Sequence, residues 1–226
     1  MKRILSFLSV VAMSATPVFA DPEISRWKTP HAMGCMMLRE CTEGVHKINT
    51  IEDLKKFYPG IDYSSVEKEF SNLVSEMNRI GIGVFLSQGK YFQTNQRGVY
   101  HTVGNNFFLN MDYMIDPSDL LAVTRHEGWH AAQDCMAGTI DNNNIAIIFS
   151  EEEVPTGYHI RADVAYSMQR GAIPWEREAM WAGETADMTV KALGACQNKD
   201  KDMWEIYKPT PMTGEWLINN GFWNGK

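Results

Sequence analysis

Apolar residues recur at helical spacing in the first third of the chain. A helix is predicted over residues 63–80, because its apolar residues lie three or four positions apart and would share one face. These residues are Val66, Phe70, Leu73, Val74 and Met77. Gly81 is a suitable residue for the end of this helix. A shorter helix is expected over residues 51–57, with Thr50 as its N-terminal cap.

Short apolar segments separated by turn-forming residues indicate β-strands. The candidate strands are Val45–Ile48, Ile82–Ser87, Tyr91–Thr94, Val99–Val103 and Phe107–Asp112. The loops between the last four segments are short and rich in polar turn residues and glycine, and such loops favour hairpins between antiparallel neighbours. We therefore expect an antiparallel sheet.

Helical patterns return in the second half of the chain. Asp116 is a suitable cap, and Pro117 a suitable first residue, for a helix that runs to about Met136. Two further helices are expected over residues 160–169 and 174–193. Helices and an antiparallel sheet in separate blocks of the chain predict the α+β class.

The composition is that of a globular protein with an acidic charge. Hydrophobic residues make up 44% and charged residues 22% of the 226, which excludes a disordered chain, a collagen and a coiled coil. Acidic residues number 28 and basic residues 21, and no segment is rich in lysine and arginine. Because nucleic-acid binding needs a basic surface, no nucleic-acid partner is expected.

Residues 1–20 have the pattern of a secretory signal peptide. Lys2 and Arg3 form a positive start, residues 4–13 are mainly apolar, and small residues precede a predicted cleavage after Ala20. A membrane span needs about 20 apolar residues, and neither this segment nor any later one reaches that length. We therefore expect export to the periplasm or the exterior, with no membrane-spanning segment.

Residues 21–226 are expected to form one domain after this cleavage. It divides into an N-terminal helical part (21–80), a core that carries the candidate chemistry (82–193) and a tail (194–226). The tail is rich in aromatic residues, which include Trp204, Tyr207, Trp216 and Trp223.

All four cysteines follow the predicted cleavage site, and they are Cys35, Cys41, Cys135 and Cys196. An even number in an oxidising compartment indicates two disulfides, and three pairings are open. Pairing Cys35 with Cys41 and Cys135 with Cys196 entangles the chain least. The alternatives are buried free thiols, or a propeptide over residues 21–80 in which Cys35 or Cys41 blocks a metal as a thiolate.

The most specific motif in the chain is His126-Glu127-Gly128-Trp129-His130, an H-E-x-x-H sequence inside a well-capped predicted helix. Residues four apart lie on one face of a helix, so both imidazoles can bind one metal ion. Glu127 is adjacent to this face but offset from it, where a base can take a proton from a metal-bound water. The alternative is a pair of histidines that only pack on the helix face.

A catalytic zinc site needs a third protein ligand and an open position for water. A third histidine six residues after His130 is excluded, because that position is Met136. A downstream glutamate is the usual remaining solution. Residues 175–182 are the best candidate segment, since they combine glutamates with small residues that allow two helices to approach closely.

These features resemble zincin-like metallopeptidases of the gluzincin type. In several small families of that type, the glutamate ligand directly precedes alanine in a Glu-x-Glu-Ala sequence, which Glu176-Arg177-Glu178-Ala179 matches. The resemblance covers residues 82–193 and implies Glu178 as the third ligand. Glu176 and Glu184 are the alternatives.

The resemblance also implies a zincin-like fold, in which an antiparallel sheet packs against the H-E-x-x-H helix and a downstream helix that carries the glutamate ligand. Phe107–Asp112 then corresponds to the edge strand that pairs with an extended peptide substrate. Tyr158 or His159 is a candidate for stabilising the developing oxyanion. The alternative is a packed tyrosine beside a surface histidine.

The function expected from the sequence is that of an exported zinc metallopeptidase acting on peptides or proteins. His126, His130 and Glu178 would hold Zn²⁺, and Glu127 would move a proton from the attacking water to the leaving amine. Two alternatives are a non-catalytic, zinc-stabilised binding module and a zinc hydrolase of non-peptide amides, such as those of a cell wall. A base at Glu127 argues against the binding module, because a structural site has no use for one.

Overall fold

The computed structural model describes residues 27–137, 140–141 and 145–196. The helices are α2 (Pro30–Met37), α3 (Ile51–Lys55), α4 (Glu67–Arg79), α5 (Pro117–Met136), α6 (Thr156–Ala165), α7 (Ile173–Glu184) and α8 (Met188–Ala195). The strands are β1 (Val45–Lys47), β2 (Gly83–Ser87), β3 (Gly98–His101) and β4 (Asn106–Asn110). Short 3₁₀ helices cover Gly89–Tyr91, Met111–Tyr113 and Arg170–Ala172. The predicted α+β class is confirmed, while the signal peptide and most of the aromatic tail lie outside the described residues.

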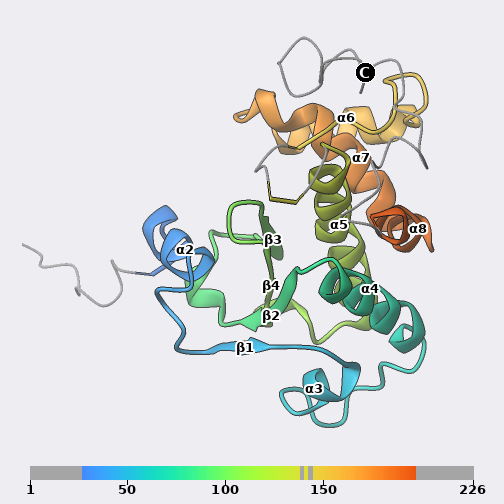
Figure 1. The fold of residues 1–226 in the computed structure, drawn as a ribbon. Helices are drawn as coiled ribbons and strands as arrows, with labels where there is room; N and C mark the ends of the chain where they lie inside the picture. Colours follow the sequence, from blue (N-terminus) through green and yellow to red (C-terminus); the bar gives the residue numbers. More distant parts are fainter. Residues whose placement is uncertain (1–26, 138–139, 142–144, 197–226) are drawn as a thin grey trace, which may run out of the picture.

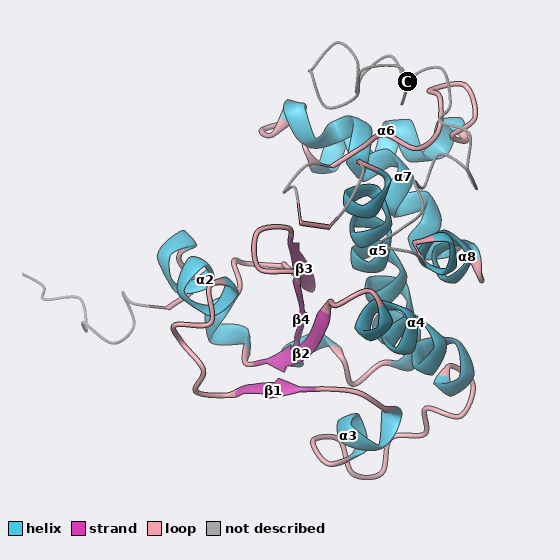
Figure 2. Ribbon diagram, in the orientation of Figure 1, coloured by secondary structure: helices cyan, strands magenta, loops and turns pink. Residues whose placement is uncertain are grey.

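Helix α5 is central to the arrangement of these elements. The sheet lies on one side of it, and α7 and α8 lie on the other (Figure 1). Within the described residues, all four strands (magenta in Figure 2) precede α5 in the chain, and the regular structure after α5 is helical. Helix α5 therefore forms the boundary between a sheet-containing half and a helical half.

The sheet has four strands in the order β1-β2-β4-β3, and it is mixed. Strands β2 and β4 are parallel, with Gly83 opposite Asn106, whereas β1 and β3 are antiparallel edge strands. The predicted all-antiparallel sheet is therefore wrong. The reason is that the chain passes from β2 to the far edge of the sheet before it returns through β4.

Residues 91–94, predicted as a strand, do not form one. Tyr91 ends a 3₁₀ helix, and its side chain and that of Phe92 are buried in a small second core with α2. The Tyr91 hydroxyl also donates a hydrogen bond to the carbonyl oxygen of Glu43 (2.7 Å). The apolar pair therefore anchors the N-terminal part of the chain, and the connection to β3 is long enough to reach the far edge.

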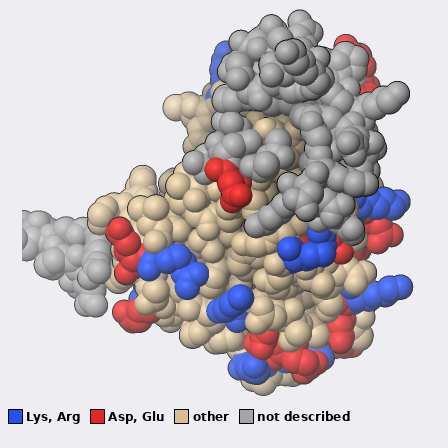
Figure 3. Space-filling view, viewed as in Figure 1, with Lys and Arg blue, Asp and Glu red and all other residues tan. Residues whose placement is uncertain are grey.

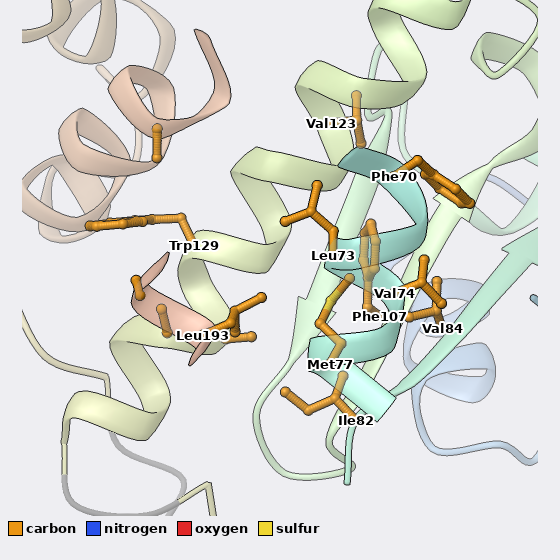
Figure 4. Packing of buried hydrophobic residues seen from close by; sticks show 14 of the residues in the cluster. Phe70, Leu73, Val74, Met77, Ile82, Val84, Phe107, Val123, Trp129 and Leu193 are labelled. Carbon is orange, nitrogen blue, oxygen red and sulfur yellow. The ribbon is translucent and has the colours of Figure 1, made fainter. Parts of the chain in front are cut away.

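Helix α4 presents the apolar face that its sequence spacing predicts. Its four fully buried residues lie between α5 and the sheet (Figure 4). They are Phe70, Leu73, Val74 and Met77. The helix begins at Glu67 and not at Tyr63, which is a buried residue whose hydroxyl donates to the carbonyl oxygen of Met114 (2.7 Å). Burial of each such side chain contributes about 1.5–3 kcal/mol, so this face is the main attachment of α4.

Helix α5 has the bounds that its capping signals predict. The carboxylate of Asp116 accepts hydrogen bonds from the backbone N–H groups of Ser118 (2.7 Å) and Asp119 (3.3 Å), and Pro117 occupies the first turn. Because α5 contacts α4, α7, α8 and β3, most of its surface is enclosed by protein. Enclosure on several sides gives the side chains of this helix fixed positions.

The helix predicted over residues 174–193 is divided into α7 and α8. The break falls at residues 185–187, where Asp187 has a left-handed backbone (φ 59°). Its N–H donates to the carboxylate of Glu69 on α4 (3.0 Å). The prediction of one helix is wrong because this tertiary contact stabilises the break. Helix α6 also lies earlier than predicted, over Thr156–Ala165 in place of residues 160–169.

The cysteines form the two pairs that entangle the chain least. Cys35 and Cys41 are bonded with a Cα–Cα distance of 5.2 Å, and Cys135 and Cys196 with one of 6.1 Å. The second bond links the end of α5 to the end of α8. Neither N-terminal cysteine is a free thiolate, so the alternative in which one blocks a metal is wrong.

Charged residues of both signs are interspersed over the described surface seen in Figure 3. No broad region of one sign occurs on the described part of this face. Among the described residues, no helix combines the length and the apolar character needed to cross a membrane.

Candidate metal centre

His126 and His130 lie one turn apart on the same face of α5. Their ring centroids are 5.0 Å apart, with the planes nearly perpendicular. The face is directed toward α7, the helix that packs most closely along α5. The local geometry is therefore the one that the H-E-x-x-H spacing predicts.

Glu176 on α7 completes a three-residue group with these histidines. One carboxylate oxygen lies 3.2 Å from Nε2 of His126, and the other lies 3.5 Å from Nε2 of His130. One ligand atom from each residue falls within 4.8 Å of the other two. The side chains are 21%, 11% and 14% exposed in the order His126, His130, Glu176, so the group is enclosed but open to a small ion.

Small residues on α7 allow this close approach. Ala179 and Ala182 are fully buried against α5. A Cβ atom on Gly183 would lie 3.2 Å from the carbonyl oxygen of Ala122 and 3.4 Å from Cβ of His126. The backbone of α7 is therefore as close to α5 as side chains permit.

Glu178, the third ligand implied by the sequence resemblance, is directed away from the two imidazoles. Its carboxylate accepts hydrogen bonds from Nε1 of Trp129 (3.2 Å), Nε2 of Gln133 (2.8 Å) and the backbone N–H of Phe149 (2.5 Å). Two positions along a helix correspond to a rotation of about 200°, so Glu176 and Glu178 face opposite sides of α7. The structure thus brings Glu176, and not the expected Glu178, to the two histidines.

The remaining alternative, Glu184, lies at the end of α7 and is not in the metal group. Its carboxylate accepts hydrogen bonds from Arg161 (2.5 Å) and from the hydroxyl of Tyr158 (3.0 Å). All three residues belong to the rim formed by α6 and α7. Glu184 therefore stabilises the packing of these helices.

Glu127 is buried beside the metal group. One of its carboxylate oxygens accepts a hydrogen bond from the backbone N–H of Tyr100 on β3 (2.8 Å). Burial raises the pKa of Glu127, and Glu176 acts in the same direction, while the neighbouring imidazoles and the Tyr100 hydrogen bond oppose the shift. A carboxylate with a raised pKa is better matched to proton transfer near neutral pH.

Charges within the group are strongly coupled. Burial opposes the charged form of each residue, but the carboxylate of Glu176 outweighs this effect and raises the pKa of His130 to about 9. Conversely, burial alone would raise the pKa of Glu176, and the two imidazoles hold it well below its usual range. Without a metal, the group therefore keeps an ionised Glu176 carboxylate beside a protonated His130 at neutral pH, and a bound cation would take the place of the proton on Nε2.

This donor set fits a zinc ion. Two imidazoles and one carboxylate are a recurring set for catalytic Zn²⁺. One oxygen of Glu176 is buried without a hydrogen bond of acceptable geometry among the described residues, although it lies 3.2 Å from Nε2 of His126. A buried oxygen of this kind has an unused capacity to bind a cation.

The group opens into a cleft of about 570 Å³ between β3, α5, α6 and α7. His126, Glu127, His130 and Glu176 all line it. The other lining residues include Val99, Tyr100, Val123, Tyr166, Gln169 and Met180. A cleft of this size can admit a segment of a larger substrate.

Tyr158 and His159, the sequence candidates for an oxyanion stabiliser, do not line this cleft. Tyr158 contacts Glu184, and Nε2 of His159 lies 2.9 Å from the carbonyl oxygen of Val154. The contacts of Tyr158 agree with the alternative of a packed tyrosine, whereas the His159 side chain is only 17% exposed and is not the surface histidine of that alternative.

Tyr166 lines the cleft instead, directly after α6. Burial raises the pKa of Tyr166, and the charge of Glu176 together with a hydrogen bond to it raises the pKa further. No motif marks this tyrosine in the sequence, and only the turn that ends α6 brings it to Glu176.

The strand beside the cleft is β3 and not the segment predicted to bind substrate. Phe107–Asp112 overlaps β4, which pairs on both sides and has no open edge. The expectation of an edge strand there is wrong, because β3 occupies the outer position. Residues 95–100 line the cleft along this edge.

Comparisons with models of known protein families, with curated proteins and with solved structures gave no match. The arrangement of the site is therefore the basis for its functional interpretation.

Proposed function

We propose that this protein is an exported zinc metallopeptidase, with His126, His130 and Glu176 as zinc ligands and Glu127 as the general base. The observation that carries the proposal is the meeting of all four side chains in one cleft. A site that only stabilised the fold would gain nothing from a buried carboxylate beside the ligands. The position of Glu127 therefore favours an enzyme over a binding module.

The metal ligands and the base would divide the reaction between them. His126, His130 and Glu176 would hold a Zn²⁺ ion, which when bound would lower the pKa of a water molecule and polarise the carbonyl group of the scissile bond. Glu127 accepts a proton from the attacking water and transfers it to the leaving amine. The N–H of Tyr100 orients the carboxylate of Glu127 through its hydrogen bond.

Two further parts of the cleft would act on the substrate. Tyr166 lines the cleft beside Glu176, and its hydroxyl would donate a hydrogen bond to the carbonyl oxygen as that oxygen becomes negative. The backbone of residues 95–99, which lines the cleft at the outer edge of the sheet beside the Tyr100 N–H that is bonded to Glu127, favours an extended peptide, since such an edge can offer hydrogen bonds to an added strand. This is the feature that favours a peptide over another amide substrate.

The test is the zinc content of the purified protein and of three alanine variants. We expect about one zinc ion per wild-type chain, and little in Glu176→Ala or His126→Ala. Glu184→Ala is the matched control, because it removes a glutamate from the same helix and the rim of the same cleft. Absence of zinc from the wild type after zinc loading would contradict the proposal.

Substrate class is tested separately with zinc-loaded protein. Cleavage of a peptide library, lost on chelation and restored by zinc, supports a peptidase. Cleavage of cell-wall fragments alone would assign the same site to a different amide.

A further inference from the structure

A chain of hydrogen bonds runs behind His130, on the side of its ring away from Glu176. Nδ1 of His130 lies 2.8 Å from Oε1 of Gln133, and Nε2 of Gln133 lies 2.8 Å from the carboxylate of Glu178. The side chain of Gln133 is fully buried, and Glu178 is 1% exposed. With neither side chain open to solvent, protein groups decide how both are oriented.

The orientation of the Gln133 amide follows from its other partners. Its nitrogen donates to the carboxylate of Glu178 and to the carbonyl oxygen of Trp175 (3.2 Å), both of which only accept. The amide oxygen must therefore face His130. An oxygen at that place accepts a hydrogen bond, so Nδ1 of His130 must carry a proton.

The carboxylate of Glu178 accepts hydrogen bonds from four groups. These are Trp129 Nε1 and the backbone N–H groups of Phe149 and Ile148, in addition to Gln133 Nε2. Of these donors, only Gln133 has a side chain that could reverse its role by rotating its amide. The carboxylate of Glu178 therefore determines the direction of the hydrogen bond to His130.

We propose that Gln133 and Glu178 are positioning residues that keep the proton of His130 on Nδ1 and present Nε2 to Glu176 and the metal. The part that concerns the metal rests on the proposed function, whereas the part that concerns the Nδ1 proton does not. Partners of this kind orient histidine ligands at many metal sites. Here the carboxylate acts through an intervening glutamine, and it lies two residues from a proposed ligand.

The decisive variant is Glu178→Gln, which keeps the shape of the side chain. The new amide has to donate with its nitrogen, and only Gln133 can become the acceptor, by rotating its own amide. Rotation turns the nitrogen of Gln133 toward Nδ1 of His130, so Nδ1 becomes the acceptor of this hydrogen bond and no longer carries a proton. Glu52→Gln, an exposed change on α3, is the matched control.

Two measurements test the effect of Glu178→Gln, one on the Nδ1 proton of His130 and one on zinc affinity. In ¹H–¹⁵N NMR spectra of the metal-free protein, wild type and Glu52→Gln should show a slowly exchanging Nδ1 proton of His130, which Glu178→Gln should lose. Competition with a zinc chelator should show zinc affinity reduced about 10–100-fold in Glu178→Gln and unchanged in Glu52→Gln. Circular dichroism confirms that the variants are folded.

A double variant separates positioning from simple packing. In Gln133→Glu with Glu178→Gln, the carboxylate at position 133 accepts from His130 Nδ1 and from the amide at position 178. The Nδ1 proton signal and most of the zinc affinity should return. If packing alone matters, the double variant should be no better than Glu178→Gln.

Distinct outcomes overturn distinct parts of this inference. A rapidly exchanging or absent Nδ1 proton in the wild type, or an unchanged one in Glu178→Gln, would overturn the relay itself. A wild-type Nδ1 proton with the expected protection, but no zinc binding, would contradict the proposed function and the metal part of this inference while the relay remained.

Discussion

Glu176 and Glu178 show how two identical side chains, two positions apart, have different chemistry. Glu176 faces the imidazoles across the cleft, where their charges hold its pKa low. Glu178 faces the opposite side of α7, where burial raises its pKa to about 7 although hydrogen bonds from protein donors oppose the shift. The neighbours of each carboxylate, and not its type, decide what it can do.

Tyr166 gives a prediction about a single side chain. Tyr166→Phe should lower kcat about 10²-fold and leave about one zinc per chain at saturating zinc, because it removes a donor to the developing oxyanion and a hydrogen bond to Glu176 but no ligand. The measurement is peptide cleavage by zinc-loaded protein. Tyr158→Phe is the matched control, and an equal loss of kcat in both variants would contradict the role of Tyr166.

Asp134 gives a prediction about pH and stability. Burial raises its pKa to about 7 against the effect of a hydrogen bond from Tyr100, so the folded protein retains a proton that the unfolded chain loses near pH 4. The contribution of this group therefore lowers the free energy of unfolding as pH rises from about 4 to 7, and is constant above.

Asp134→Asn should remove this fall, since asparagine resembles the protonated acid. The variant should match wild type near pH 4 and exceed it at pH 8 by on the order of 2–4 kcal/mol. Urea unfolding at both pH values is the measurement. A variant that follows the pH dependence of wild type would contradict the raised pKa.

At the scale of elements, the contact between α5 and α7 determines the metal group. Gly183→Val should separate the two helices, because its side chain would meet the carbonyl oxygen of Ala122 and Cβ of His126. We expect a loss of about 1–3 kcal/mol in stability and weaker zinc binding. Gly157→Val on α6, where a Cβ meets nothing within 4 Å, serves as control and should retain zinc affinity.

Elements with strong local signals could be predicted from the sequence, and those that depend on distant partners could not. The cap at Asp116 and the apolar spacing of α4 are properties of residues close together in the sequence, so α5 and α4 could be predicted from the sequence. The break before α8 depends on Glu69, and the order of the strands depends on where Tyr91 and Phe92 are buried.

In the candidate site too, some features follow from local sequence and others depend on distant contacts. The H-E-x-x-H spacing brings two histidines together through helix geometry alone, as the sequence indicates. Which glutamate joins them depends on the rotation of α7 about its own axis, which is set by the donors around Glu178. Tyr166 had no sequence signal, because its role depends on a turn at the end of α6.

For the whole molecule, the Cys135–Cys196 disulfide joins α5, which carries the two histidines, to the end of α8, and the loop it closes contains Glu176. It closes a loop with a sequence separation of 61 residues, whereas Cys35–Cys41 closes one of 6. Chain-entropy arguments give about 4 kcal/mol for the long loop and about 2 kcal/mol for the short one. Alanine at both Cys135 and Cys196 should therefore destabilise more than alanine at both Cys35 and Cys41, as measured by urea unfolding.

The long disulfide loop would have a further consequence if the protein cleaves peptide bonds as proposed. Residues 151–153 form an exposed turn inside this loop, after the histidines and before Glu176. A single cut in that turn, by another molecule of the same enzyme, would leave two fragments joined through sulfur. His126, His130 and Glu176 would stay in one covalent unit, so nicked molecules could persist in an oxidising environment with the site intact.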